Sequence, residues 1–262
     1  MQKEMDRFGV LEASVMLESP QATHYAGRLA DGRRVVLKVL SDEGLQREGA
    51  GLRLLARYSG ENTVAVLAQE GRAVLMERLV GEMLITLWQA GEVEAAEDVA
   101  IGLVNAVHAE AVSAEGLVGL DAHFAAALAW DEPAALGAQV LVRGLLDGAS
   151  EAVALHGDVH PRNIMRRREG WCLIDPIGLC GPRAFDYANM FLNPWDFAGV
   201  HKDAARIKRL AGKVTAACGA SEQEVLGWAA ANALWWAEAR ARLGLGAGYP
   251  MGLMRVFARM AG

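Results

Sequence analysis

The pattern of apolar and polar positions divides the chain into two parts. In roughly the first 80 residues, short apolar runs rich in β-branched residues alternate with turn signals, which is typical of strands. The predicted strands cover residues 23–29, 34–40, 63–69 and 73–79. Asp31-Gly32 between the first two predicts a hairpin with a tight primed turn. Residues 45–58 carry apolar side chains at helical spacing and predict one helix in this part.

From about Gly81 the pattern becomes helical, with long stretches of alanine, leucine and glutamate. The predicted helices cover residues 92–109, 122–130, 136–146, 204–217 and 222–243. Residues 153–194 interrupt this pattern with strand and turn signals. We therefore expect an α+β fold of two lobes: a small β-rich lobe over residues 1–79 and a larger, mainly helical lobe over residues 80–262.

The interruption at residues 153–194 concentrates the polar residues that could do chemistry. Apolar runs at 163–166 and 171–174 flank a charged turn and predict a hairpin, which would bring Asn163 close to Asp175. Asp158 lies five residues before Asn163. Phosphoryl transfer needs a carboxylate to receive the hydroxyl proton and hard oxygen ligands to hold Mg²⁺ on the phosphates. We assign Asp158 as the catalytic base and Asn163 and Asp175 as the metal ligands.

Composition narrows the classes of partner. The chain is 53% apolar and 22% charged, which excludes a disordered protein, and its net charge of −6 disfavours nucleic acid and favours a cationic ligand. The N-terminus lacks the apolar core of a secretory signal, and no apolar run is long enough to span a membrane. Three cysteines without metal-type spacing are expected to be free thiols, so the expected compartment is the cytoplasm.

The ordered residues resemble a known superfamily. Asp158, Asn163 and Asp175 are similar to the catalytic and metal loops of protein-kinase-like enzymes, while His156-Gly157-Asp158 and Asp175-Pro176 resemble the aminoglycoside phosphotransferase branch. Gly178, Gly181-Pro182, Ala184-Phe185-Asp186 and Asn189-Met190 resemble the subgroup of streptomycin 6-phosphotransferases and hydroxyurea-resistance kinases. The resemblance covers residues 20–195 and implies ATP and Mg²⁺ as cofactors.

The same resemblance assigns roles to residues of the first lobe. Lys38 matches the lysine that contacts the α- and β-phosphates, and Glu48 matches its ion-pair partner. The segment containing Glu77 and Leu79 matches the inter-lobe hinge, whose backbone binds the adenine edge. Asp186 matches a residue that supports the active loops.

Two departures from the superfamily affect the nucleotide site. No Gly-x-Gly-x-x-Gly precedes Lys38, so the loop around residues 19–24 is expected to cover the phosphates through Thr23 and backbone N–H groups. Pro176 replaces the bulky residue that follows the metal-binding aspartate in protein kinases, and its fixed φ argues against a movable switch.

Other residues allow simpler readings. His156 and His160 flank Asp158 in a way that also fits a metallohydrolase, although further ligands at suitable spacing are lacking. We expect Arg166, Arg167 and Arg168 to be solvent-exposed residues of the hairpin turn, with nucleic-acid binding as the alternative. Trp228, Trp235 and Trp236 are read as core residues, with ligand stacking as the alternative. The glycines at 244, 246 and 248 indicate a helix stop.

The expected function is phosphorylation of a small-molecule hydroxyl by MgATP. The resemblance implies an aminoglycoside such as streptomycin as the acceptor, or hydroxyurea. A metabolite kinase for choline, a sugar or a sugar amine, and a non-catalytic nucleotide-binding protein of the same fold, stay open as alternatives. The sequence leaves the regiochemistry, the choice between ATP and GTP and the oligomeric state undetermined.

Overall fold

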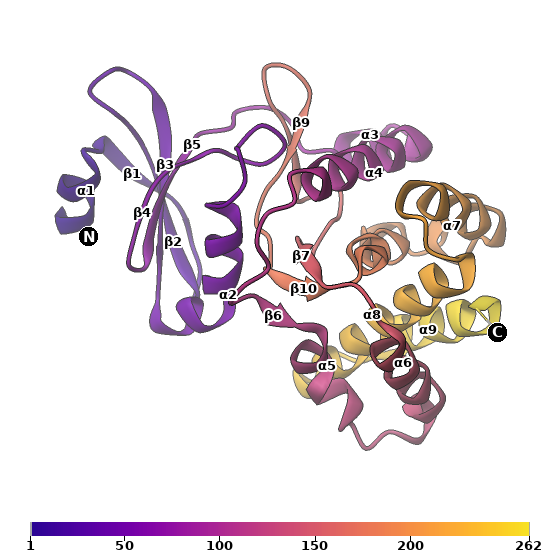
Figure 1. Cartoon of the computed structure of the whole chain (residues 1–262). Helices are drawn as coiled ribbons and strands as arrows, with labels where there is room; N and C mark the ends of the chain where they lie inside the picture. Colours follow the sequence, from indigo (N-terminus) through magenta and orange to yellow (C-terminus); the bar gives the residue numbers. More distant parts are fainter. Residues whose placement is uncertain (1, 262) are drawn as a thin grey trace.

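A five-stranded antiparallel sheet forms the first lobe of the computed structural model, which describes residues 2–261 (Figure 1). The strand order is β1-β2-β3-β5-β4, so β3 is central and is paired on both edges. The strands are β1 (Leu11–Glu18), β2 (Ala22–Arg28), β3 (Arg34–Leu40), β4 (Val66–Glu70) and β5 (Ala73–Glu77).

The alternation of side chains along β3 places apolar residues on both faces of the sheet. Val35 and Leu37 pack on the outer face, together with Met5 of α1 (Gln2–Phe8). Val36 and Leu40 pack on the inner face, together with Leu52 of α2 (Asp42–Leu55). Figure 1 shows α2 between the sheet and the helical lobe. Because Lys38 has the parity of Val36 and Leu40, its side chain lies on this inner face.

Helix α2 makes close contact with the second lobe through its glycines. Ser41 caps its first turn by accepting a hydrogen bond from the Gly44 N–H at 3.0 Å. A methyl group on Gly51 would collide with the carbonyl oxygen of Pro176, and one on Gly178 would collide with the backbone of Ala50. The helix therefore lies directly on the turn that contains Asp175.

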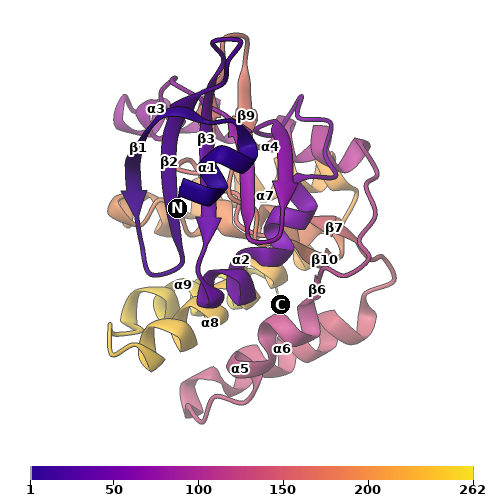
Figure 2. The same cartoon turned by 90° about the vertical axis from the view of Figure 1, so that its left-hand side faces the viewer.

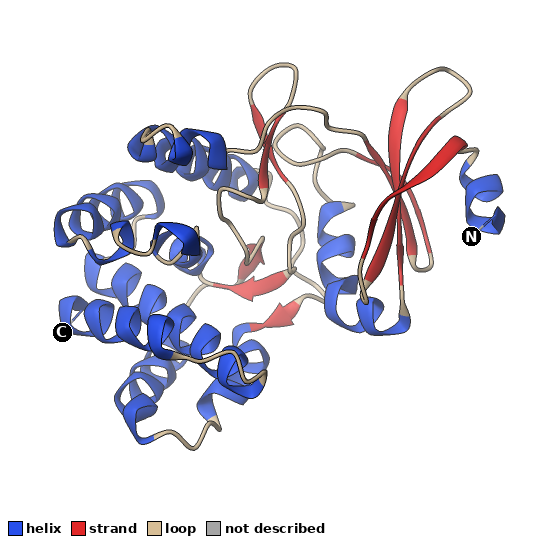
Figure 3. Cartoon of the chain, turned by 180° about the vertical axis from the view of Figure 1, so that it is seen from behind, coloured by secondary structure: helices blue, strands red, loops and turns tan. Residues whose placement is uncertain are grey.

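The second lobe is made mainly of helices (Figures 2 and 3). The other helices pack around α8 (Glu222–Arg242), which is buried on most of its surface. A helix that is apolar around its whole circumference belongs in a core, and Trp228 at its middle is fully buried. The helices are α3 (Ile85–Gln89), α4 (Val93–Ala109), α5 (Leu120–Leu128), α6 (Leu136–Gly148), α7 (Ala204–Cys218), α8 (Glu222–Arg242) and α9 (Gly248–Ala261). No helix of residues 2–261 has the length and apolar character needed to cross a membrane.

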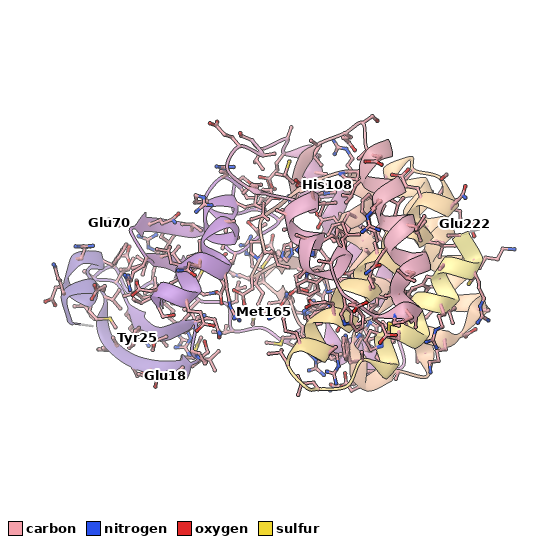
Figure 4. All side chains as sticks on the ribbon, turned by 90° about the horizontal axis from the view of Figure 1, so that it is seen from below. Glu18, Tyr25, Glu70, His108, Met165 and Glu222 are labelled. Carbon is pink, nitrogen blue, oxygen red and sulfur yellow. The ribbon has the colours of Figure 1, made fainter. Side chains whose placement is uncertain are left out.

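Five short strands form two small sheets in the second lobe, β6-β10-β7 and β8-β9. They are β6 (Val118–Gly119), β7 (Val153–Leu155), β8 (Ile164–Arg166), β9 (Trp171–Leu173) and β10 (Leu179–Gly181). In the β8–β9 hairpin, the Leu173 carbonyl accepts from the Val64 N–H at 2.9 Å, and the Ile164 carbonyl accepts from the Leu84 N–H at 2.9 Å. The hairpin is thus bonded to the first lobe on one side and to the inter-lobe connection on the other. Met165 lies where the lobes meet, with Tyr25 and Glu222 towards opposite ends of the molecule (Figure 4).

The predicted fold class and most predicted elements are confirmed, with shifted boundaries. The expected lobe boundary at residues 79–80 falls in the connection between β5 and α3. Among the α-helices and strands, the sequence analysis did not predict α1, β1, α3, β6 and α9, nor the bounds of β7 and β10 within residues 153–194. The predicted primed turn between β2 and β3 is wrong: a primed type I turn needs two residues with positive φ, and of Asp31 and Gly32 only Gly32 has one.

We predict that Gly51→Ala destabilises the protein by about 1–3 kcal/mol, because the methyl group must push the turn at Pro176 away from α2. Chemical denaturation measures the change in the free energy of unfolding. Gly49→Ala is the matched control on the same helix, since its methyl group meets only side-chain atoms at 3.4 Å or more. That variant should be neutral or more stable by up to about 1 kcal/mol. Equal effects of the two substitutions would contradict the prediction.

Candidate active site

Lys38 joins the two lobes through two carboxylates. Its Nζ lies 2.7 Å from Oε2 of Glu48 on α2 and 3.2 Å from Oδ1 of Asp175 in the second lobe. Only 5% of Lys38 is exposed. Burial lowers the pKa of this amine, but Asp175 and Glu48 outweigh burial, and the net pKa is raised. Lys38 is therefore a stable cation at neutral pH.

Asp158 is held by amide groups at both carboxylate oxygens. Asn163 Nδ2 donates to Oδ2 at 2.9 Å and also to the Asp158 carbonyl at 3.0 Å. Asn189 Nδ2 donates to Oδ1 at 2.7 Å, and His160 Nε2 lies 3.5 Å from Oδ2. Burial raises the pKa of Asp158, but His160, His156 and the Asn163 amide outweigh it and leave the net pKa below the ordinary value. Asp158 is an anion at neutral pH.

The loop before Asp158 is fixed by a buried carboxylate. Asp186 Oδ2 accepts from the His156 N–H at 3.0 Å and from His108 Nε2 at 2.9 Å, and its Oδ1 accepts from the Gly157 N–H at 2.6 Å. These bonds agree with the supporting role predicted for Asp186. Burial raises the pKa of Asp186, but the interactions with His108 and His156 outweigh it, so the net pKa is lowered.

His156 uses both ring nitrogens within the protein. Nδ1 accepts from the Asp158 N–H at 3.2 Å, so Nε2 carries the proton and donates to the Ile174 carbonyl at 2.9 Å. Burial lowers the pKa of His156 and keeps the ring neutral. His156 thus ties the Asp158 loop to the strand end before Asp175 and has no nitrogen left for a metal, which removes the support for the metallohydrolase reading. Within residues 2–261, no three His, Cys, Asp or Glu side chains are grouped as a metal site.

A cleft of about 350 Å³ lies between the lobes at this point. It brings together Lys38, Glu48, Asp158, Asn163 and Asp175, the residues that the sequence analysis selected from segments far apart in the chain. Asp175 has a positive φ of 53° and its side chain is 54% exposed.

The prediction that Thr23 covers the phosphates is wrong. Thr23 pairs with Val39 on β3 and therefore lies on the outer face of the sheet, away from the cleft. His24 pairs with Lys38 and lines the cleft instead. Burial, followed by the charge of Lys38, lowers the pKa of His24 and keeps it neutral.

Glu77 and Leu79 lie at the connection between the lobes, as predicted from the resemblance. The Glu77 side chain is already bound: its Oε1 accepts from the Ala65 N–H at 2.9 Å and forms an ion pair with Arg167. Arg167 also donates to the carbonyl groups of Glu61 and Thr63. The reading of Arg167 as part of a solvated turn is therefore wrong, because this side chain ties the β8–β9 turn to the first lobe.

A second, smaller cavity of about 110 Å³ lies on the other side of Asp158. Its wall includes His123, Asn232, Trp235 and Trp236. The rings of His123 and Trp235 are stacked with centroids 4.8 Å apart, and Trp235 and Trp236 meet edge to face at 5.0 Å. The core prediction is confirmed for Trp228. Trp235 and Trp236 also pack against the core, but they are only partly buried and line this cavity as well.

Sequence reasoning missed the roles of His24, His123, Asn189 and Asn232 in lining these spaces. Only Asn189 carried a signal, as part of the subgroup motif. The others come from β2, α5 and α8, where a single polar residue in an apolar segment does not reveal which face it occupies.

Comparison with solved structures shows the fold of the chain. Two similar structures are 13% and 15% identical to it, so they are evidence for the fold alone. Aminoglycoside phosphotransferase APH(4)-Ia, in a ternary complex with ADP and hygromycin B, gives a TM-score of 0.64 at 15% identity over 100% of this chain and 98% of that one. Choline kinase LicA from Streptococcus pneumoniae gives 0.67 at 13% identity over 98% and 97%. The two lobes and their cleft therefore form a protein-kinase-like fold.

The sequence comparison is more specific. The model of the aminoglycoside/hydroxyurea antibiotic resistance kinase family matches residues 14–243, more than the 20–195 expected from the motifs, and the chain belongs to this family. Streptomycin 3''-kinase of Klebsiella pneumoniae is 35% identical over 153 residues, 56% of this chain. The match spans 57% of that relative's length.

We predict that Asp186→Asn lowers the free energy of unfolding by about 3 kcal/mol at pH 7, because charged hydrogen bonds to two backbone amides and His108 are weakened. The folded-state pKa of Asp186 is lowered, so its contribution is present at neutral pH and is lost as the pH falls through that value. The difference in unfolding free energy between the variant and the wild type, measured by urea unfolding at several pH values, should therefore become smaller as the pH falls.

The matched control is Asp98→Asn, which removes an exposed carboxylate paired with Lys213 at 2.6 Å. That change should cost less than about 1 kcal/mol. A difference in unfolding free energy for Asp186→Asn that is small at pH 7, or that does not narrow as the pH falls, would contradict the assignment.

Proposed function

We propose that this chain is an ATP- and Mg²⁺-dependent kinase that phosphorylates a hydroxyl group of an aminoglycoside such as streptomycin. The observation that carries the proposal is the single cleft in which Lys38, Glu48 and Asp175 lie beside Asp158 and Asn163. The family match supports the aminoglycoside as the acceptor.

In the proposed nucleotide site, Lys38 neutralises the α- and β-phosphates and Glu48 holds its ammonium group in place. The backbone between Glu77 and Leu79 receives the adenine edge. The Glu77 carboxylate is engaged by Arg167, so the contribution of Glu77 would come from its main chain. The complex of a structural neighbour with ADP supports the choice of nucleotide.

The donor set of the cleft fits magnesium. Asn163 directs its Nδ2 at Asp158, which leaves its amide oxygen as a hard ligand, and the half-exposed carboxylate of Asp175 is a second one. A bound Mg²⁺ would neutralise phosphate charge, with the nucleotide and water completing its shell. Asn163 would thus hold the base through one end of its amide and the metal through the other.

Asp158 would receive the proton of the acceptor hydroxyl. Its low pKa makes it a weak base, which suits a reaction in which positioning and charge neutralisation supply most of the acceleration. The carboxylate oxygens retain free lone pairs beyond the two amide bonds, so a hydroxyl can still donate to one of them.

The proposed acceptor entrance is the aromatic cavity beside Asp158. Burial lowers the pKa of His123 to about 4, so this ring adds no positive charge at neutral pH. Neutral aromatic faces next to an anion favour a cationic group of the acceptor.

The small size of that cavity also favours a second candidate, a kinase for a small cationic metabolite such as choline. A panel of aminoglycosides and small amino alcohols, assayed for ATP consumption, separates the two. Turnover with metabolites alone would refute the antibiotic acceptor.

We predict that Asp158→Ala lowers kcat by at least about 100-fold while nucleotide affinity stays within about threefold of wild type, because the base does not hold the nucleotide. Steady-state kinetics and MgATP titration by calorimetry give the two values. Asp158→Asn, which keeps the shape of the side chain, serves as the control for packing. Near-normal turnover in both variants would refute the assignment of the base. MgATP binding without turnover in the wild type would instead favour a non-catalytic nucleotide-binding protein.

We also predict that Trp235→Ala raises the KM for the acceptor about tenfold and leaves the KM for ATP unchanged, since the stacked wall of the acceptor cavity is lost. Trp171→Ala is the control: this ring lies under Arg166 in the β8–β9 hairpin at 4.5 Å. An unchanged KM for the acceptor in the Trp235→Ala variant would contradict the placement of the acceptor in this cavity.

A further inference from the structure

Three asparagines form a chain of amides that ends on Asp158. Asn189 Oδ1 accepts from Asn193 Nδ2 at 2.6 Å and from Asn232 Nδ2 at 3.2 Å. Asn189 Nδ2 then donates to Asp158 Oδ1 at 2.7 Å. Asn189 and Asn232 are 3% and 4% exposed, so these amides are shielded from water.

The orientation of the central amide is fixed by its neighbours. A carboxylate can only accept hydrogen bonds, so the NH₂ end of Asn189 must face Asp158. In this orientation Asn189 Oδ1 faces the NH₂ groups of Asn193 and Asn232 and accepts from both. The contact with Asp158 thus sets the orientation, and the two contacts at the other end hold the amide in it.

The chain of amides links three separate parts of the second lobe. Asn189 lies in the 3₁₀ segment Arg183–Phe191, Asn193 follows it, and Asn232 lies on α8 one turn before Trp236. Asn189, Asn232 and Trp236 also line the aromatic cavity beside Asp158. Helix α8 therefore contributes both the wall of this cavity and a donor that orients the amide on Asp158.

We propose that Asn189 is a positioning residue that fixes the rotamer of Asp158, and that Asn232 and Asn193 fix the amide of Asn189 in turn. The proposal rests on the proposed function, in which Asp158 is the base. Asn163 and His160 lie at Oδ2, whereas Asn189 donates to Oδ1, so without Asn189 the carboxylate could rotate about its Cβ–Cγ bond and leave the acceptor hydroxyl. Asn163 then holds Oδ2 of Asp158 and Asn189 holds Oδ1, so the free lone pairs of the carboxylate keep a fixed direction for the acceptor hydroxyl.

The test replaces the amide of Asn189, in its contact with Asp158, by a carboxyl group. Asn189→Asp sets a second carboxylate beside Asp158, so the two share one proton and the pKa of the pair is raised. The other charged or titratable groups around Asp158 are His160, His156, His123 and Asp175 in its own lobe. Across the cleft they are Lys38, Glu48, His24 and Arg47 of the first lobe. The substitution leaves all of these in place.

In kinetic assays between pH 5 and 9, Asn189→Asp should lower kcat at pH 7 by at least about tenfold. The acid limb of kcat should move up by about one pH unit or more, so part of the lost rate returns in alkali. The KM for ATP should stay within about twofold. A kcat profile identical to wild type would overturn the proposal.

A second readout needs no acceptor. In the Asn189→Asp variant a carboxyl keeps its proton to a higher pH in the folded state than in the unfolded chain, so the variant should lose Tm relative to wild type as the pH rises from about 4 to 8. The double variant Asn189→Asp/Asp158→Asn restores an amide facing a carboxylate and should recover most of that Tm. No pH-dependent loss, or no recovery in the double variant, would overturn the proposal.

Asn105→Asp is the matched control. Asn105 Oδ1 accepts from the hydroxyl of Tyr187, in the same 3₁₀ segment as Asn189, at 2.5 Å, and a carboxylate can accept this bond as well. Its kcat profile and the pH dependence of its Tm should match wild type. A wild-type protein that phosphorylates no aminoglycoside would refute the proposed function while the thermal cycle still tests the contact between Asn189 and Asp158.

Discussion

The ammonium group of Lys38, buried between the lobes, is the constraint on which the arrangement of the cleft depends. A buried cation is stable only with close counter-charges, and here one comes from each side: Glu48 on α2 and Asp175 in the second lobe. The central strand, the helix beneath it and the turn after β9 must therefore converge on one point. The glycine contacts between α2 and that turn allow the backbones to come close enough for both carboxylates to reach.

A second buried charge organises the opposite wall. Asp186 binds two consecutive backbone N–H groups of the loop that leads to Asp158, and His156 carries the constraint on to Ile174. The loop is consequently held by the carboxylate of Asp186 and by the imidazole of His156. Asp158, the proposed base, is thus held in place by the protein alone, as expected for a reaction that depends on orientation.

The sequence revealed those parts of the fold and site that follow from local pattern or from an ordered motif. The apolar alternation of residues 34–40 identified the central strand, and the hairpin around residues 166–170 brought Asn163 and Asp175 together as expected. Thr23 was misassigned because the face of β2 depends on its register with β3, which one strand's composition does not determine. Asn232 was not found, and Trp235 was assigned to the core with ligand stacking only as the alternative, since their place beside the cavity comes from the packing of α8 against a loop about 75 residues earlier.

The β8–β9 hairpin, bonded through Leu173 to Val64 and through Ile164 to Leu84, has a mechanical consequence. The main-chain bond between Leu173 and Val64 and the covalent connection between β5 and α3 are two separate links between the lobes, so rotation of one lobe is easiest about the line that joins these links. Twisting or sliding of one lobe across the other would break main-chain bonds. Rotation about that line would change the width of the cleft entrance and leave these main-chain bonds intact.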